Sequence, residues 1–137
     1  MVIALVDGSV VCSNWTYETG YLGRCVTYVL RDPRNQEVRY VGASIREQSR
    51  RQGHSSISLR SSAPVDVWKR RLRSRGLKPV FEVIEEFNCE RSALMAERRW
   101  IEFFAGLYGP RLLNRQHHPM FKLSGYGPTR RVNFVGR

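Results

Sequence analysis

The chain has 137 residues, enough for one ordinary domain and too few for two, and it is 42% hydrophobic, so it can form a core. Lys and Arg number 23 against 12 Asp and Glu, which gives a formal net charge of +11. The sequence has no run of about 18 apolar residues, so we expect no membrane span. The apolar N-terminus lacks the basic start of a secretory signal.

The basic residues are mostly arginine, with 20 Arg and only 3 Lys. The arginine side chain carries a planar fork that matches two phosphate oxygens at once. An arginine excess on a small folded domain therefore favours a polyanionic partner, most often nucleic acid. The three widely spaced cysteines argue against a disulfide framework and against a Cys-rich zinc site, so we expect a reducing, cytoplasmic location.

The first half of the chain is predicted to form two hairpins. Residues 2–6 and 9–12 are apolar runs joined by Asp7-Gly8, a typical type I′ turn. Residues 13–24 form a polar connection with several glycines. A second hairpin pairs residues 25–30 with 38–42 across a turn-rich loop.

The middle of the chain is predicted to be helical. A short Arg-rich helix runs from Ile45 to about Gln52 and ends at Gly53. Apolar residues at helical spacing, beginning at Val65, predict a second helix that is capped by Gly76.

The last predicted elements are a strand over residues 79–84 and a helix from about Glu90 to Gly106 that Asn88 is expected to cap. We expect a single domain with an N-terminal hairpin extension (1–24), a core (25–115) and a basic C-terminal tail (116–137). The expected fold class is α/β in the α+β sense: a small, mostly antiparallel, three-stranded central sheet flanked by helices, with an added N-terminal β-hairpin.

A set of residues in this order resembles the motifs of the GIY-YIG nuclease family. Arg50 follows the second motif by eight residues, and His54 follows Arg50 by four. The set is Val26-Thr27-Tyr28, Tyr40-Val41-Gly42, Arg50, His54, Glu97 and Asn114. The resemblance covers residues 25–115 and is closest to the catalytic domains of phage homing endonucleases. It implies the GIY-YIG fold and a metal-dependent DNA endonuclease.

The sequence departs from the family pattern in two places. The first motif is Val-Thr-Tyr and lacks the glycine, but it keeps the tyrosine. Ala43 stands where many relatives carry a lysine, so we expect another group, such as His54, to tune the residue that activates the nucleophile.

The resemblance assigns roles that agree with the chemistry of phosphodiester hydrolysis. Glu97 is the expected ligand of one divalent ion, Mg²⁺ or Mn²⁺, because Mg²⁺ needs few carboxylates and keeps waters and phosphate as its other ligands. Tyr28 is the expected general base, with its pKa lowered by Arg50 and a metal-bound water, and Tyr40 orients the water or the phosphate.

The remaining site residues have supporting roles. Arg50 and His54 lie one helical turn apart, so Arg50 is expected to clamp the phosphate and His54 to relay a proton or bond the base. Arg46 and Arg51 are close enough in sequence to be confused with Arg50. Asn114 is expected to support the site structurally, and Gly42 to let the backbone approach the substrate.

The segment 45–75 holds nine cations and two anions, which gives it +7 of the total charge of +11. We expect it to contact the phosphate backbone, which provides affinity and salt dependence rather than sequence specificity. Besides Arg50 and Arg75, the cations of this segment are Arg46, Arg51, Arg60, Lys69, Arg70, Arg71 and Arg73.

The sequence thus predicts an endonuclease that acts on DNA, with RNA as an open alternative substrate. The biological role stays open between homing, structure-specific or single-strand, and restriction-type nucleases. A non-catalytic nucleic-acid-binding protein that keeps the fold is the alternative from another class.

Overall fold

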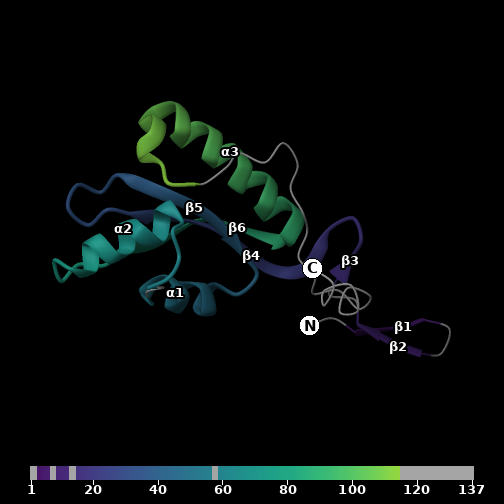
Figure 1. The fold of residues 1–137 in the computed structure, drawn as a ribbon. Coiled ribbons are helices and arrows are strands. Elements are labelled where there is room, and N and C mark those ends of the chain that lie inside the picture. The colour runs from purple at the N-terminus through teal and green to yellow at the C-terminus, as the bar shows by residue number, and fades with distance from the viewer. Residues whose placement is uncertain (1–2, 7–8, 13–14, 57–58, 115–137) are drawn as a thin grey trace.

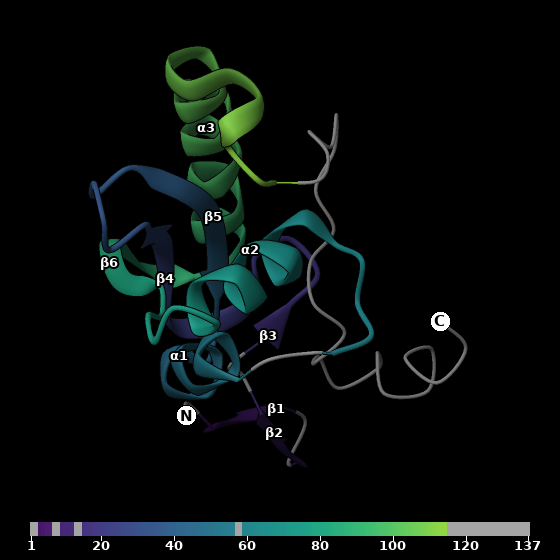
Figure 2. The ribbon, with the colours of Figure 1, turned by 60° about the vertical axis from the view of Figure 1, so that its left-hand side comes forward.

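The structure is a computed structural model that describes residues 3–6, 9–12, 15–56 and 59–114. Over these residues the fold is α+β, with a four-stranded antiparallel sheet and three α-helices (Figure 1). Strands β1 (Ile3–Val6) and β2 (Ser9–Cys12) form a separate antiparallel pair, which stands away from the main sheet (Figures 1 and 2). This pair confirms the predicted N-terminal hairpin, although its turn lies outside the described residues.

The long strand β4 (Gly20–Arg31) is the centre of the main sheet. It pairs with β5 (Val38–Ser44) along one side and with β6 (Val80–Cys89) along the other. The short strand β3 (Trp15–Thr16) pairs with its first residues. The prediction of three strands was therefore wrong by one.

The missing strand lies in the segment predicted to be an irregular connection. The turn between β3 and β4 closes where the Thr16 hydroxyl accepts a hydrogen bond from the Thr19 N–H at 3.0 Å. Gly20 follows with a φ of 69°, which glycine adopts without strain. Two residues are too few to give an alternating hydrophobic pattern, so the sequence carries no signal for β3.

Helix α3 (Glu90–Tyr108) covers one face of the sheet, and helices α1 (Glu47–Ser55) and α2 (Pro64–Arg73) lie on the other (Figure 1). Side chains of β4 alternate between these layers. Val29 packs in a cluster with Phe104 of α3, whereas Tyr28 and Leu30 pack with Trp68 of α2. Both faces of β4 are buried, so residues 25–30 read as a continuous apolar run.

The first two helices occupy the predicted segments with shifted ends. Helix α1 includes Gly53 and ends at Ser55, and the backbone becomes extended at Ser56. An isolated glycine weakens a helix without ending it, and this explains why the predicted stop was wrong. Helix α2 ends at Arg73, and Gly76 then takes a φ of 73° while the Leu77 N–H bonds the Leu72 carbonyl at 2.9 Å. Gly76 therefore closes this end of α2 as predicted.

Strand β6 is longer than predicted and reaches Cys89, the residue before α3. Asn88 belongs to this strand, so its predicted role as a helix cap was wrong. The N-terminus of α3 is bonded from another segment instead, since the Arg91 N–H donates to the Thr19 carbonyl at 2.8 Å. The predicted tail 116–137 lies outside the described residues. No helix in the described part of the chain is long and apolar enough to cross a membrane.

Candidate active site

The two tyrosines of the motifs lie on adjacent strands and on the face covered by α1 and α2. Tyr28 on β4 stands opposite Gly42 on β5, and Leu30 stands opposite Tyr40. The Tyr28 side chain is buried, and its ring stacks on Phe81 of β6 at 4.4 Å between centroids. The ring is thus held between its own strand and a neighbouring one.

Gly42 has a different reason for being glycine than the predicted approach to substrate. A Cβ atom at this position would overlap the hydroxyl and Cζ of Tyr28. The tyrosine ring therefore crosses directly over the Gly42 backbone. The two motif residues are complementary because one provides the space that the other fills.

His54 joins this pair from helix α1. Its Nε2 lies 2.7 Å from the Tyr28 hydroxyl, and its ring centroid is 5.7 Å from that of Tyr40. Burial lowers the pKa of His54 to about 3, and the charges of Lys69 and Arg50 act in the same direction. The imidazole is therefore neutral at physiological pH.

Lys69 of α2 lies on the other side of the same imidazole. Its Nζ is 2.6 Å from His54 Nδ1, and the residue is buried, with 6% exposure. Burial lowers the pKa of Lys69, while Asp66, 4.0 Å away, opposes that change. The structure thus places Lys69 inside the site, whereas the sequence predicts a surface contact to the phosphate backbone.

Burial outweighs Arg50 in setting the pKa of Tyr28 in the protein chain by itself. Burial raises it, and Tyr40 and Glu97 act in the same direction, whereas Arg50 lowers it. Burial likewise raises the pKa of Tyr40. The expected effect of Arg50 is present but smaller than the cost of desolvating a phenolate, so both phenols are protonated at neutral pH.

Glu97 approaches the site from α3, past the outer edge of β5. Its carboxylate accepts a hydrogen bond from the Ala43 N–H. Burial raises the pKa of Glu97 to about 7, although the Ala43 bond and Arg50 favour the charged form. A carboxylate that is so poorly solvated gains from a neighbouring cation.

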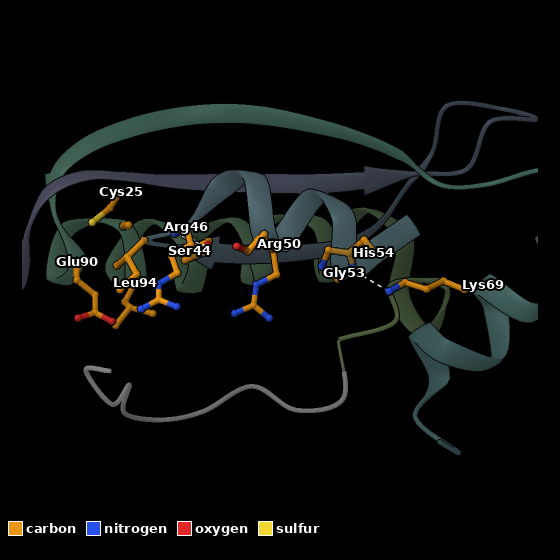
Figure 3. A pocket seen from close by; sticks show the side chains of 13 residues that line it. Cys25, Ser44, Arg46, Arg50, Gly53, His54, Lys69, Glu90 and Leu94 are labelled. Carbon is orange, nitrogen blue, oxygen red and sulfur yellow. Dashed lines mark hydrogen bonds between the residues drawn. The ribbon is translucent and has the colours of Figure 1, made fainter. Parts of the chain in front are cut away.

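A cavity of about 480 Å³ runs along α1 beside these residues (Figure 3). Arg46 and Arg50 point into it, and the bonded pair His54 and Lys69 closes one end. Arg50 is exposed, so its guanidinium is accessible to a phosphate. The charge of Arg50 acts on Tyr28, Tyr40, His54, Lys69 and Glu97 alike.

The structure distinguishes the surroundings of Arg50 from those of Arg51, whereas the sequence alone does not distinguish their roles clearly. Arg51 lies over the Phe81 ring at 4.3 Å and pairs with Glu47 at 3.0 Å. It lines the side of α1 that faces β6, away from the cavity. Arg51 is therefore better explained as a packing residue than as the predicted substrate contact.

The other predicted backbone contacts lie on α2 and in the segment before it. Arg60, Arg71 and Arg73 are exposed, and Arg73 lines a smaller cavity of about 280 Å³ on the far side of His54 and Lys69. Arg70 donates to the Ser61 carbonyl at 2.8 Å, which ties α2 to the segment before it.

Asn114 bonds the outer edge of β5. Its Oδ1 accepts from the Val41 N–H at 2.9 Å, and its Nδ2 donates to the Val41 carbonyl at 2.8 Å. The Leu113 N–H donates to the Arg39 carbonyl at 2.6 Å. Together with the Glu97 carboxylate at Ala43, these groups bond the backbone of β5 along the edge that pairs with no strand among the described residues. Asn114 thus lies where the predicted supporting role requires.

We expect Asn114→Ala to lower the free energy of unfolding by about 1–3 kcal/mol, because two backbone groups of Val41 lose their partners. Denaturant unfolding followed by circular dichroism measures the change. Asn88→Ala, at an exposed position of β6, is the control and should change stability little. Equal stability of the Asn114 and Asn88 variants would contradict the supporting role of Asn114.

Two contributors to this site were missed in the sequence. Phe81 supports the Tyr28 ring, and the Ala43 N–H holds the Glu97 carboxylate. The alternating pattern of residues 79–84 signals that Phe81 faces one side of a strand, but it does not say what lies there. A backbone N–H has no sequence signal at all.

Glu97 offers a poorly solvated carboxylate, the kind of oxygen ligand that suits a hard metal ion. Among the described residues no group of three or more His, Cys, Asp or Glu side chains could hold a metal. A hard ion that keeps most of its water ligands does not need such a group, so a single carboxylate beside the cavity fits Mg²⁺ or Mn²⁺.

Comparisons with models of known protein families, with curated proteins and with solved structures found no match to this chain. The fold and the site together define an α+β domain with a basic cavity, which is lined by a neutral histidine and an accessible arginine, with two buried tyrosines behind the histidine.

Proposed function

We propose that this chain is a metal-dependent DNA endonuclease of the GIY-YIG type, which hydrolyses phosphodiester bonds. One observation carries the proposal: Tyr28 of β4, Arg50 and His54 of α1 and Glu97 of α3 come from three elements, and the charge of Arg50, which lines the basic cavity, acts on the other three. Their order and spacing in the sequence resemble the motifs of that family, with Val-Thr-Tyr as the first motif and Ala43 in place of a lysine.

Arg50 is the residue proposed to bind the scissile phosphate. It is exposed at the cavity, and a guanidinium bonds two phosphate oxygens at once. Negative charge grows on those oxygens and on the leaving oxygen as the phosphorus–oxygen bond breaks. A fixed cation at this place stabilises that charge more than it stabilises the bound substrate.

Tyr28 is proposed to take the proton of the attacking water. After it has lost its own proton to solvent, the phenolate accepts one proton from water as the water oxygen bonds to phosphorus. The bond from phosphorus to the leaving oxygen then breaks, the leaving oxygen keeps the electron pair and takes a proton from solvent, and no covalent enzyme intermediate forms. Burial raises the pKa of Tyr28 and so disfavours the phenolate. Positive charge near Tyr28 in the substrate-bound site must therefore stabilise the phenolate.

Glu97 is proposed to hold one Mg²⁺ or Mn²⁺. When bound, the ion would supply positive charge to the phosphoryl oxygens and to a coordinated water. The Ala43 N–H keeps the carboxylate oriented toward this edge of the sheet. Arg46, Arg60, Arg70, Arg71 and Arg73 are proposed to contact the phosphates that flank the reacting one, with DNA as the main substrate and RNA as the alternative.

The test is a cleavage assay on labelled single-stranded, duplex and branched DNA and on single-stranded RNA, with Mg²⁺, with Mn²⁺ and with EDTA. We expect the wild-type chain to cut at least one of the DNA substrates with metal and none with EDTA. Binding to all of them without any cleavage would show a non-catalytic nucleic-acid-binding protein instead. Cleavage of RNA alone would correct the substrate class.

A further inference from the structure

Three side chains form a continuous hydrogen-bonded row from α2 to the central strand. Lys69 Nζ contacts His54 Nδ1 at 2.6 Å, and His54 Nε2 contacts the Tyr28 hydroxyl at 2.7 Å. Lys69 is buried at 6% exposure, and its ion-pair partner in α2, Asp66, is 4.0 Å away. Its shortest polar contact is thus to a ring nitrogen and not to a carboxylate.

The chemistry of an ammonium group fixes the direction of both bonds. An ammonium only donates hydrogen bonds, so His54 Nδ1 must present its lone pair to Lys69. A neutral imidazole then carries its proton on Nε2, and that N–H donates to the Tyr28 oxygen. The Tyr28 hydroxyl proton consequently points away from His54.

We propose that Lys69 is a positioning residue that fixes the tautomer of His54, so that Nε2–H donates to Tyr28 and stabilises its phenolate form. The inference rests on the proposed function for its catalytic meaning. When Tyr28 loses its hydroxyl proton to solvent, the donated hydrogen bond and the charge of Lys69 behind it both favour the anion. When the phenolate takes a proton from water, the same row returns to its starting state with no change at His54 or Lys69.

The surroundings of His54 leave Lys69 as the group that sets its tautomer. From β4 and β5 the tyrosines Tyr28 and Tyr40 face the ring, and Phe81 faces it from β6. Arg50 on α1 and Asp66 on α2 act on it through their charges. Of these groups, Tyr28 and Lys69 are the ones in hydrogen-bond contact with the two ring nitrogens.

The first measurement is the tautomer of His54 in the full chain, read from the ¹⁵N chemical shifts of its two ring nitrogens by NMR. We expect the Nε2–H form in the wild-type protein. In Lys69→Met, which keeps the length of the side chain and removes the ammonium, we expect that preference to be lost. Lys78→Met removes an exposed lysine outside the row and should leave the His54 signals unchanged.

The second measurement is single-turnover cleavage by the same variants. We expect Lys69→Met to lower the rate constant on the order of 10- to 100-fold while the Kd for DNA stays within about two-fold, since positioning partners of a histidine have effects of this size. Lys69→Arg, which also only donates, should retain the tautomer and part of the rate. A lysine that only binds phosphate would instead raise Kd and leave the rate at saturation unchanged.

The two readouts distinguish failure of this inference from failure of the proposed function. An Nδ1–H tautomer in the wild-type protein, or the same tautomer in wild type and Lys69→Met, would overturn the role of Lys69 even if the chain cuts DNA. If the chain cuts nothing, the proposed function fails, and the NMR result still decides whether Lys69 controls His54.

Discussion

Glu97→Gln is expected to lower the rate of cleavage roughly 10³-fold, because charge stabilisation by a bound metal is worth several kcal/mol. The amide keeps an oxygen for the Ala43 N–H but loses the negative charge that a cation needs. DNA binding should be retained, since removing an anion from a basic cavity does not oppose a polyanion. Single-turnover kinetics and a binding assay on the same DNA measure the two effects.

The same substitution has a predictable effect on stability, and its sign follows from the pKa. The pKa of Glu97 rises from its ordinary 4.5 to about 7 in the folded chain, so the folded state holds this proton more tightly than the unfolded state. The contribution of Glu97 to stability therefore falls as pH rises through this window and is lowest above pH 7. We expect Glu97→Gln to melt at a higher temperature than wild type at pH 8.

Glu102→Gln is the matched control on the same helix, since Glu102 is exposed and pairs with Arg98 at 3.7 Å. It should change neither the cleavage rate nor the pH dependence of melting. Wild-type cleavage by Glu97→Gln, or an equal loss in Glu102→Gln, would remove Glu97 from the metal site.

Gly42→Ala is expected to damage both stability and activity, because the new methyl group would occupy the place of the Tyr28 hydroxyl. The Tyr28 ring has little freedom to move, since it stacks on Phe81 and bonds His54. Overpacking of this kind costs about 1–3 kcal/mol, and any movement that relieves it breaks the bond to His54. Denaturant unfolding and single-turnover cleavage measure the two losses.

Two further variants make the Gly42 prediction specific. Gly106→Ala lies in α3 with nothing within 4 Å of the added methyl group, so it should raise stability by about 0.5–1 kcal/mol. In a Tyr28→Phe background the atom that the methyl meets first is gone, so Gly42→Ala should cost less stability than it does in wild type. Equal costs in the two backgrounds would show that the overlap with the Tyr28 hydroxyl is not the cause.

The sequence predicts the elements of this fold well where a periodic pattern is long. The apolar run at residues 25–30, the strand around Tyr40 and the helix from Glu90 all carry such patterns, and all are present. The errors lie where structure depends on partners distant in sequence. Asn88 is a common cap residue, but strand pairing continues through it, and a carbonyl of the β3–β4 turn bonds the helix end instead.

The candidate site likewise has residues that the sequence predicts and residues whose positions depend on packing. The family resemblance singles out Tyr28, Arg50, His54 and Glu97; Arg50 and His54 line the cavity, and the charge of Arg50 acts on Tyr28 and Glu97. The positions of Lys69 and Arg51 depend on the direction in which each side chain leaves its short helix, and the sequence does not predict that direction. Six Lys and Arg residues of α1 and α2 look alike in the sequence, and packing alone places one against His54 and another on Phe81.

The most direct test of the central claim compares wild type and Tyr28→Phe in single-turnover cleavage of end-labelled DNA, with protein in excess and Mg²⁺ present. The substitution removes one oxygen atom and keeps the ring on Phe81. We predict that wild type cuts the DNA, and that Tyr28→Phe binds it equally but cuts it at least 100-fold more slowly. Loss of a general base typically lowers a rate by this amount. Equal rates for the two proteins, or no cleavage by wild type of any DNA form, would contradict this claim.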